Sequence, residues 1–376
     1  MKRISIVVLI LCAGFVSVAW GQEPACGTHT PWAEFHRHNM QRWNPCEKVL
    51  NVKNVGNLNL KWSSTTGVIS YSSPTVASGV VYVGSYDNNV YALNAKTGAK
   101  LWSYTTGSGV YSSPAVANGV VYVGSDDYNV YALDAKTGAK LWSYASGDGV
   151  ECSPTVANGV VYVGSRSGNL YALNASTGAK LWSYSTGIAW YSSPAVADGV
   201  VYVGSGDYNM YALNASTGAK LWSYTTGSYL QSSPAVANGV VYVGSADANL
   251  YALKASTGAK LWSYHTGDWV QSSPAVANGV VYVGSTDSNL YALNASTGTK
   301  LWSYTTGKQV LSSPAVANGV VYVGSFDNNV YALNAKTGAK LWSYTTGSYV
   351  WSSPAVANGT VYVGSYDGNV YAFGLK

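Results

Sequence analysis

One 40-residue unit is repeated along almost the whole chain, and this repeat limits the possible folds more than any other feature. A tryptophan returns at this interval, and a proline follows the same spacing. The tryptophans are Trp62, Trp102, Trp142, Trp182, Trp222, Trp262, Trp302 and Trp342. The prolines are Pro74, Pro114, Pro154, Pro194, Pro234, Pro274, Pro314 and Pro354. Residues 57–376 therefore hold eight copies, and such a period is typical of a propeller, a solenoid or an array.

Each unit contains four short segments with the composition of strands. In the unit 110–149, Asn118-Gly119 is a strong signal for a two-residue hairpin turn, with valine-rich segments on both sides. We expect the strands of this unit at 110–117, 119–124, 130–133 and 140–144. Four short strands in a unit of this length predict one propeller blade.

The two ends of the repeat region predict how the ring closes. The last unit stops at Lys376 after three strands, and a lone strand at 58–62 precedes the first complete unit. Pairing these segments leaves no free sheet edge at the seam. The sequence therefore predicts an all-β, eight-bladed β-propeller of four-stranded antiparallel blades, with the last blade closed by the N-terminal strand.

The repeated proline predicts the order of the strands within a blade. Proline cannot donate a hydrogen bond to a ladder, so it belongs on an edge strand. Each first strand carries Ser-Ser-Pro, and we expect it to line the central channel. The strand with the tryptophan is then outermost, and we expect the eight repeat tryptophans to be structural residues that dock on the neighbouring blade.

Composition excludes two classes of protein. The hydrophobic content of 47% is too high for a disordered chain. The net charge of +5 comes from scattered lysines, so we expect no nucleic-acid partner.

The first 21 residues have the features of a secretory signal peptide. Lys2 and Arg3 precede an apolar run at 4–11, and small residues stand at Ala19 and Gly21. The run is too short to span a bilayer, so we expect a mature protein that does not span the membrane. Cys12 in a lipoprotein signal is the less favoured alternative, because Leu11 is bulky for that motif. We expect an exported protein, periplasmic or extracellular.

Residues 22–56 form an N-terminal extension before the repeats. An exported protein meets an oxidising environment, which favours a disulfide between Cys26 and Cys46. His36 and His38 lie between these cysteines, but the spacing matches no zinc pattern, so we expect no metal site. Cys152 is then left outside any disulfide. The sequence leaves open whether the extension caps the ring or trails from it.

The segment Ala95-Lys96-Thr97-Gly98, followed by Trp102, resembles the tryptophan-docking motif of the PQQ-like (pyrroloquinoline-quinone) β-propeller family. Asparagine replaces the motif's aspartate in most copies. The leader at 32–35 and 54–58 is also similar to the start of exported members. The resemblance covers nearly all of the mature chain and implies the propeller fold.

The resemblance implies two different activities. The family includes quinoprotein alcohol dehydrogenases and a non-catalytic propeller lipoprotein of outer-membrane protein assembly. In the dehydrogenases the quinone lies in the channel mouth beside adjacent cysteines, with a catalytic aspartate and a calcium ion held by Glu, Asn and Asp. This chain has no adjacent cysteines and no haem-attachment motif. In these features the chain is more similar to the non-catalytic exported members.

Differences between the eight copies cluster in two loops of each unit. One loop enters the first strand and the other joins the second and third strands, so in an up-and-down blade both lie on one face of the disc. The turns of the opposite face barely vary. We call the first the variable face and the second the scaffold face. A variable face on an invariant scaffold is typical of a binding surface.

We call the unit that follows residues 110–149 unit three; it has Cys-Ser-Pro where the other units have Ser-Ser-Pro. We expect the residue before each of these tripeptides to lie on a circle around the channel mouth. These residues are Tyr71, Tyr111, Glu151, Tyr191, Gln231, Gln271, Leu311 and Trp351. Neighbouring loop residues that add aromatic surface are Trp190, Tyr229, Trp269 and Tyr349. Such side chains suit peptide or sugar binding, and the alternative is that they only plug the channel.

Unit three departs most from the others. Glu151 and Arg166 are expected either to pair at the rim or to bind a charged ligand, and unconstrained drift explains the same differences. The other seven units carry an aspartate in the second loop, two residues before an asparagine. We expect an Asx turn at these aspartates rather than calcium binding, because separate blades do not supply six converging oxygens.

These observations favour an exported, non-catalytic, monomeric propeller scaffold that binds a protein or polysaccharide on its variable face, without a cofactor. The candidate ligand-binding residues are Tyr71, Tyr111, Glu151, Arg166, Trp190, Tyr191, Gln231, Trp269, Gln271 and Trp351. The alternative is a PQQ-dependent dehydrogenase with calcium that oxidises an alcohol or sugar. That chemistry needs several acids at the mouth, where the sequence places Glu151 alone. A repeat array without a specific ligand is a third possibility.

Overall fold

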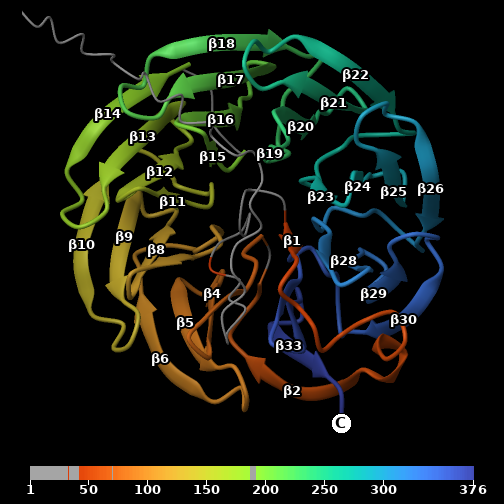
Figure 1. Ribbon diagram of the computed structural model, residues 1–376. Coiled ribbons are helices and arrows are strands. Elements are labelled where there is room, and N and C mark those ends of the chain that lie inside the picture. The colour runs from red at the N-terminus through yellow and green to blue at the C-terminus, as the bar shows by residue number, and fades with distance from the viewer. Residues whose placement is uncertain (1–32, 34–41, 70, 187–191) are drawn as a thin grey trace, which may run out of the picture.

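Eight sheets, seven of four strands and one of five, are arranged as a closed ring around a central channel (Figure 1). The computed structural model describes residues 33, 42–69, 71–186 and 192–376. The innermost strands are β3 (Thr75–Ala77), β7 (Ala115–Ala117), β11 (Thr155–Ala157), β15 (Ala195–Ala197), β19 (Ala235–Ala237), β23 (Ala275–Ala277), β27 (Ala315–Ala317) and β31 (Ala355–Ala357). The second strands are β4 (Val80–Gly84), β8 (Val120–Gly124), β12 (Val160–Gly164), β16 (Val200–Gly204), β20 (Val240–Gly244), β24 (Val280–Gly284), β28 (Val320–Gly324) and β32 (Thr360–Gly364).

The two outer positions of each blade complete the sheets. The third strands are β5 (Asn89–Asn94), β9 (Asn129–Asp134), β13 (Asn169–Asn174), β17 (Asn209–Asn214), β21 (Asn249–Lys254), β25 (Asn289–Asn294), β29 (Asn329–Asn334) and β33 (Asn369–Gly374). The outermost strands are β2 (Asn59–Thr65), β6 (Lys100–Thr105), β10 (Lys140–Ala145), β14 (Lys180–Ser185), β18 (Lys220–Thr225), β22 (Lys260–His265), β26 (Lys300–Thr305) and β30 (Lys340–Thr345). The extension adds β1 (Trp43–Asn44) and the 3-10 turn η2 (Val55–Asn57).

The N-terminal strand closes the eighth blade, as predicted. β2 pairs antiparallel with β33, and Trp62 lies opposite Ala372. The resulting sheet has the order β2-β33-β32-β31. At the same seam, Trp342 of the seventh blade donates its indole N–H to the carbonyl of Leu58 at 3.0 Å. The predicted eight-bladed, all-β ring is confirmed.

Each repeat tryptophan docks on the next blade. Trp102 donates its Nε1–H to the carbonyl of Ala135 at 3.1 Å, and the same carbonyl accepts the hydroxyl of Tyr82 at 3.0 Å. The indole covers Gly138, where an added Cβ would lie 2.7 Å from the ring. This close approach explains the glycine in each Thr-Gly turn that a repeat tryptophan covers.

The innermost strands are shorter than predicted. The segment 110–117 was expected to be one strand, but β7 begins only at Ala115, directly after Pro114. Before the proline, the backbone N–H of Val110 donates to Ser85 of the preceding blade, and the Ser112 hydroxyl accepts the N–H of Gly124 at 2.8 Å. These bonds take the place of ladder pairing, so the residues before the proline form a loop that joins two blades.

The extension packs into the ring, which settles a point that the sequence left open. β1 pairs parallel with the innermost strand β27, giving the seventh blade a fifth strand. Arg42 is fully buried and donates to the carbonyls of Pro314 at 2.9 Å and Pro354 at 3.2 Å. Burial lowers the pKa of this guanidinium to about 9. On the other side of the channel, the carbonyl of Ala33 accepts the N–H of Val116.

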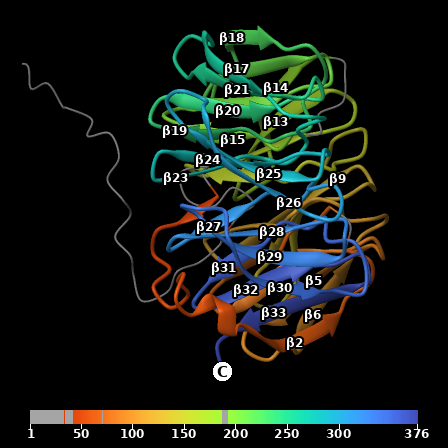
Figure 2. The same ribbon diagram turned by 90° about the vertical axis from the view of Figure 1, so that its right-hand side faces the viewer.

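The described residues that follow β1 lie against the scaffold face of the last two blades (Figure 2). The Glu47 carboxylate accepts the N–H of Gly359, and Asn318 donates to the carbonyl of Leu50. Both partners on the ring belong to the hairpin turns between first and second strands. Cys46 is disulfide-bonded, whereas Cys152 keeps its thiol; the predicted partner Cys26 and the signal peptide lie outside the described residues. The described part of the structure holds no helix of the length and apolarity that crossing a membrane takes.

Tyr322, in the seventh blade, provides a test of the packing where the two ends of the chain meet, which we call the seam. The equivalent Tyr282 donates its hydroxyl to Ala335 at 3.0 Å, whereas buried Tyr322 has no hydrogen-bond partner among the described residues. We expect Tyr282→Phe to lower the free energy of unfolding by about 1 kcal/mol, and Tyr322→Phe to leave it unchanged or raise it. Urea unfolding of both variants measures the difference. Equal losses would contradict the seam geometry.

Candidate functional site

The two variable loops share one face of the disc, as expected. In seven of the blades, the described residues of the loop that enters the innermost strand bond to the loop between the second and third strands. Tyr86 donates its backbone N–H to Val68 at 2.9 Å, and Asp126 donates to Gly109 at the same distance. Of the described extension residues, Glu47 and Leu50 contact turns of the opposite face.

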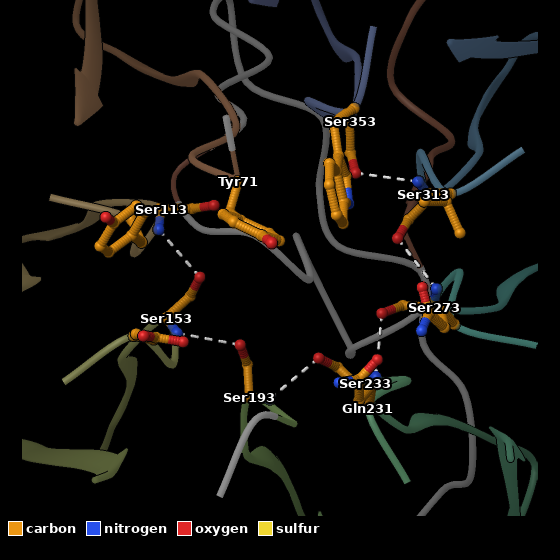
Figure 3. Close-up of a pocket in the computed structure, with 14 residues that line it drawn as sticks. Tyr71, Ser113, Ser153, Ser193, Gln231, Ser233, Ser273, Ser313 and Ser353 are labelled. Atoms are coloured by element: carbon orange, nitrogen blue, oxygen red, sulfur yellow. Dashed lines mark hydrogen bonds between the residues drawn. The ribbon is translucent and has the colours of Figure 1, made fainter. Parts of the chain in front are cut away.

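The predicted ring of residues before each Ser-Pro lines a cavity at the channel mouth (Figure 3). Its volume is about 310 Å³. The predicted residues that line it are Tyr71, Tyr111, Glu151, Gln231, Gln271, Leu311 and Trp351. Trp190 and Tyr191 lie outside the described residues. The structure therefore brings seven of the eight predicted mouth residues to one cavity, while Trp269 lies elsewhere on the variable face.

A closed ring of serine hydrogen bonds lies under this mouth, and we did not predict it from the sequence. Ser73 donates its backbone N–H to the hydroxyl oxygen of Ser113 at 2.8 Å, and Ser353 donates to Ser73 at 2.9 Å, which closes the circle. The bonds between them join Ser113, Ser153, Ser193, Ser233, Ser273, Ser313 and Ser353 in turn. The sequence did contain a signal for this ring. Within the four residues that end at the repeated proline, only this serine and the proline are the same in all eight copies.

Seven aromatic rings form a continuous band from the mouth outward, which we call the aromatic crescent. In order of contact its members are Tyr86, Tyr111, Tyr71, Trp351, Phe326, Tyr349 and Tyr366. The closest pair is Tyr71 and Trp351, whose ring centroids lie 4.2 Å apart. Tyr86 is 58% exposed and Tyr366 is 46% exposed. Four adjacent blades thus present aromatic surface on one half of the variable face.

Trp269 forms a separate, smaller aromatic pair. Its ring meets Tyr229 edge to face at a centroid distance of 5.8 Å, and the indole is 44% exposed. Lys308 lies between this pair and the crescent, with its ammonium 5.4 Å from the ring centroid of Tyr349.

Unit three places a charged cluster on the rim of the mouth. Arg166 lies 3.4 Å from the Glu151 carboxylate and 3.2 Å from Asp126. The predicted pairing with Glu151 is present, and the contact with Asp126 was not foreseen because the two residues belong to different copies. Burial raises the pKa of Glu151, and Arg166 opposes this shift without cancelling it. Burial also raises the pKa of the Cys152 thiol, which disfavours a reactive thiolate.

The raised pKa of Glu151 predicts a pH dependence. A carboxyl group whose pKa is higher in the folded protein destabilises the fold as the pH rises and the group ionises. Glu151→Gln is therefore expected to have a higher melting temperature than the wild type at about pH 7, and the difference should disappear near pH 4. Thermal unfolding at both pH values measures this. A lower melting temperature for the variant at neutral pH would show that the ion pair dominates.

The loop aspartates form the expected Asx turns and have a further structural role. Asp127 accepts the backbone N–H of Asn129 at 3.1 Å. Its other oxygen accepts the Tyr131 hydroxyl at 2.7 Å and the N–H of Gly107 at 2.6 Å, which ties together both variable loops. Within the described ranges, no group of three or more His, Cys, Asp or Glu side chains is placed to hold a metal ion.

The polar groups of the mouth bear on PQQ and calcium, which the resemblance implies. Among the described lining residues Glu151 is the one carboxylate, and it faces Arg166. The other polar groups are amides and hydroxyls. Calcium takes six to eight oxygens, several of them from carboxylates. This donor set does not fit a quinone-bound calcium ion.

The ring of eight blades with docking tryptophans defines a PQQ-like β-propeller. The chain belongs to the family described as outer membrane protein assembly factor BamB, whose family model matches residues 52–154, 145–268 and 227–373. No curated protein matches the chain significantly.

Solved structures share the fold at low sequence identity. BamB from Moraxella catarrhalis is 22% identical, with a TM-score of 0.75 over 85% of this chain and 100% of that chain. A quinohemoprotein alcohol dehydrogenase from Comamonas testosteroni is 17% identical, with a TM-score of 0.81 over 92% of this chain and 80% of that chain. The computationally designed protein Ika8 is 19% identical, with a TM-score of 0.74 over 83% of this chain and 99% of that chain.

Proposed function

We propose that this chain is an exported, non-catalytic binding module that docks a protein partner on its variable face. The observation that carries the proposal is the aromatic crescent, a contiguous band of partly exposed rings on loops that hydrogen bonds hold in place. We propose further that the chain is a monomer and uses no cofactor.

The crescent has the composition of a protein-binding surface. Tyrosine and tryptophan supply large contact areas and lose little conformational entropy when they are fixed. Tyr71 is 49% exposed and Tyr349 is 40% exposed, although both contact other rings. Contiguous exposed apolar surface on a soluble protein marks an interaction site. The family description, an outer membrane protein assembly factor, supports a protein as the partner.

The outer half of the crescent gives the sharpest test. The double variant Tyr349→Ala, Tyr366→Ala removes two exposed rings and is expected to weaken binding of a captured partner by at least about tenfold. The control is Leu221→Ala, because Leu221 is 53% exposed on the outer rim, away from this face. Both variants should keep the wild-type melting temperature. Unchanged binding by the double variant would overturn the proposal.

The quinoprotein alternative is tested separately with PQQ and calcium. We expect no saturable change in the absorbance spectrum of the purified protein and no dye-linked oxidation of alcohols or sugars. Saturable quinone uptake with turnover would replace the binding module by an enzyme.

A further inference from the structure

We propose that the mouth cavity is a binding site for a neutral saccharide, with one or two sugar rings held between an aromatic and an amide wall. The cavity volume of about 310 Å³ is at the lower end of the range for small-molecule sites, which begins near 300 Å³. The inference goes beyond protein docking, because the cavity lies at the channel axis while the crescent extends outward from it.

Two opposite walls of the cavity differ in chemistry. Three adjacent blades supply Trp351, Tyr71 and Tyr111, with centroid distances of 4.2 and 5.8 Å between neighbouring rings. Across the channel from Tyr71, another blade supplies Gln231 (Figure 3), and the next blade along the chain supplies Gln271. A sugar ring has an apolar C–H face and an edge of hydroxyl groups. The aromatic wall matches the first, and the amides, which both donate and accept hydrogen bonds, match the second.

The serine ring supplies further donors to the cavity. Seven of its members line the cavity, from Ser113 to Ser353. Each hydroxyl oxygen already accepts a backbone N–H, for example that of Ser233 at the Ser273 oxygen at 2.9 Å. A hydroxyl also carries one proton, so each serine can still donate a hydrogen bond. Sugar hydroxyl and ring oxygens are suitable acceptors.

The charged cluster at the rim of the mouth disfavours an anionic ligand. Arg166 contacts two carboxylates, Asp126 and Glu151, so the cluster does not offer an excess of positive charge to an anion. In the described loops of the mouth the backbone is bonded between blades, as in the contact of Val150 with Ser125 at 3.1 Å, so these loops offer a peptide main chain no strand edge to pair with. Recognition must come from the side chains of the cavity wall.

The test uses three neutral disaccharides, cellobiose, maltose and chitobiose, with the intact mature protein. We expect at least one to bind saturably, with a Kd of about 1 mM or tighter, by calorimetry and by saturation-transfer NMR. Trp351→Ala should weaken that binding at least tenfold. Tyr128→Ala is the matched control, because Tyr128 is 54% exposed in a loop of the same face and does not line the cavity, so this variant should bind as the wild type does. Gln271→Leu tests the amide wall at similar side-chain volume.

Three results would overturn the inference: no saturable binding of any disaccharide up to about 20 mM, undiminished binding by both Trp351→Ala and Gln271→Leu, or preferential binding of an uncharged tripeptide. The protein-docking proposal fails by a different measurement. The variant Tyr349→Ala, Tyr366→Ala leaves the cavity wall intact, so saccharide binding can persist when partner capture is lost. Conversely, partner capture can persist in a protein that binds no saccharide.

Discussion

Removing residues 1–65 is expected to lower the melting temperature by about 10 °C or more relative to a chain that lacks only residues 1–58. The two deletions differ by the closing strand β2, which pairs with six residues of β33 and buries Trp62 to 8% exposure. Loss of one buried tryptophan alone costs about 3–5 kcal/mol, and the unpaired edge of β33 adds to this cost.

The exposed edge also predicts self-association. An unpaired strand edge is a template for another chain, so the longer deletion should form concentration-dependent oligomers in size-exclusion chromatography. The shorter deletion keeps β2 and should elute as the intact protein does. Equal melting temperatures for the two chains would contradict closure of the ring by the N-terminal strand.

Replacement of a docking tryptophan is the second large effect. Trp222 is 9% exposed, donates to the carbonyl of Ala255 at 2.8 Å and packs on Gly258. Trp222→Ala is expected to lower the free energy of unfolding by about 3–5 kcal/mol. Trp269→Ala, at an exposed position, should change it by no more than about 0.5 kcal/mol. Denaturant unfolding measures both, and similar losses at the two positions would contradict the docking role.

The repeats made most of the architecture predictable. The interval of Trp62 and its seven equivalents gave the blade number, and the unequal chain ends gave the closure. The position before Ser-Ser-Pro identified the mouth, because equivalent residues in a closed ring lie on one circle around the axis. These predictions depend on symmetry, so each copy supports the others.

Features outside the repeat were not predictable in this way. Arg42 has no equivalent in any copy, and nothing in its local sequence indicates that it enters the channel and bonds to Pro314 and Pro354. The contact between Arg166 and Asp126 joins two copies across a blade boundary. The prediction that β7 begins at residue 110 was wrong. Before Pro114, hydrogen bonds to the Ser112 side chain and to the preceding blade replace the pairing of strands, and strand propensity does not account for such bonds.

The same architecture explains why binding is assigned to one face. On the scaffold face the hairpin turns are nearly identical, and the extension covers those of the last two blades, as in the bond from Gly359 to Glu47. On the variable face, Asp127 and its equivalents fix the loops from beneath, so the outward side chains are free to differ without changing the backbone.

A photo-crosslinking scan in cells that produce the protein tests the assignment of binding to the variable face most directly. A crosslinkable residue is placed singly at Tyr86, Tyr349 and Tyr366 on the variable face, and at Asn238 and Asn278 in scaffold-face turns. Discrete protein adducts from the three variable-face positions alone are the expected result. Adducts from Asn238 or Asn278, with none from the aromatic positions, would contradict the assignment.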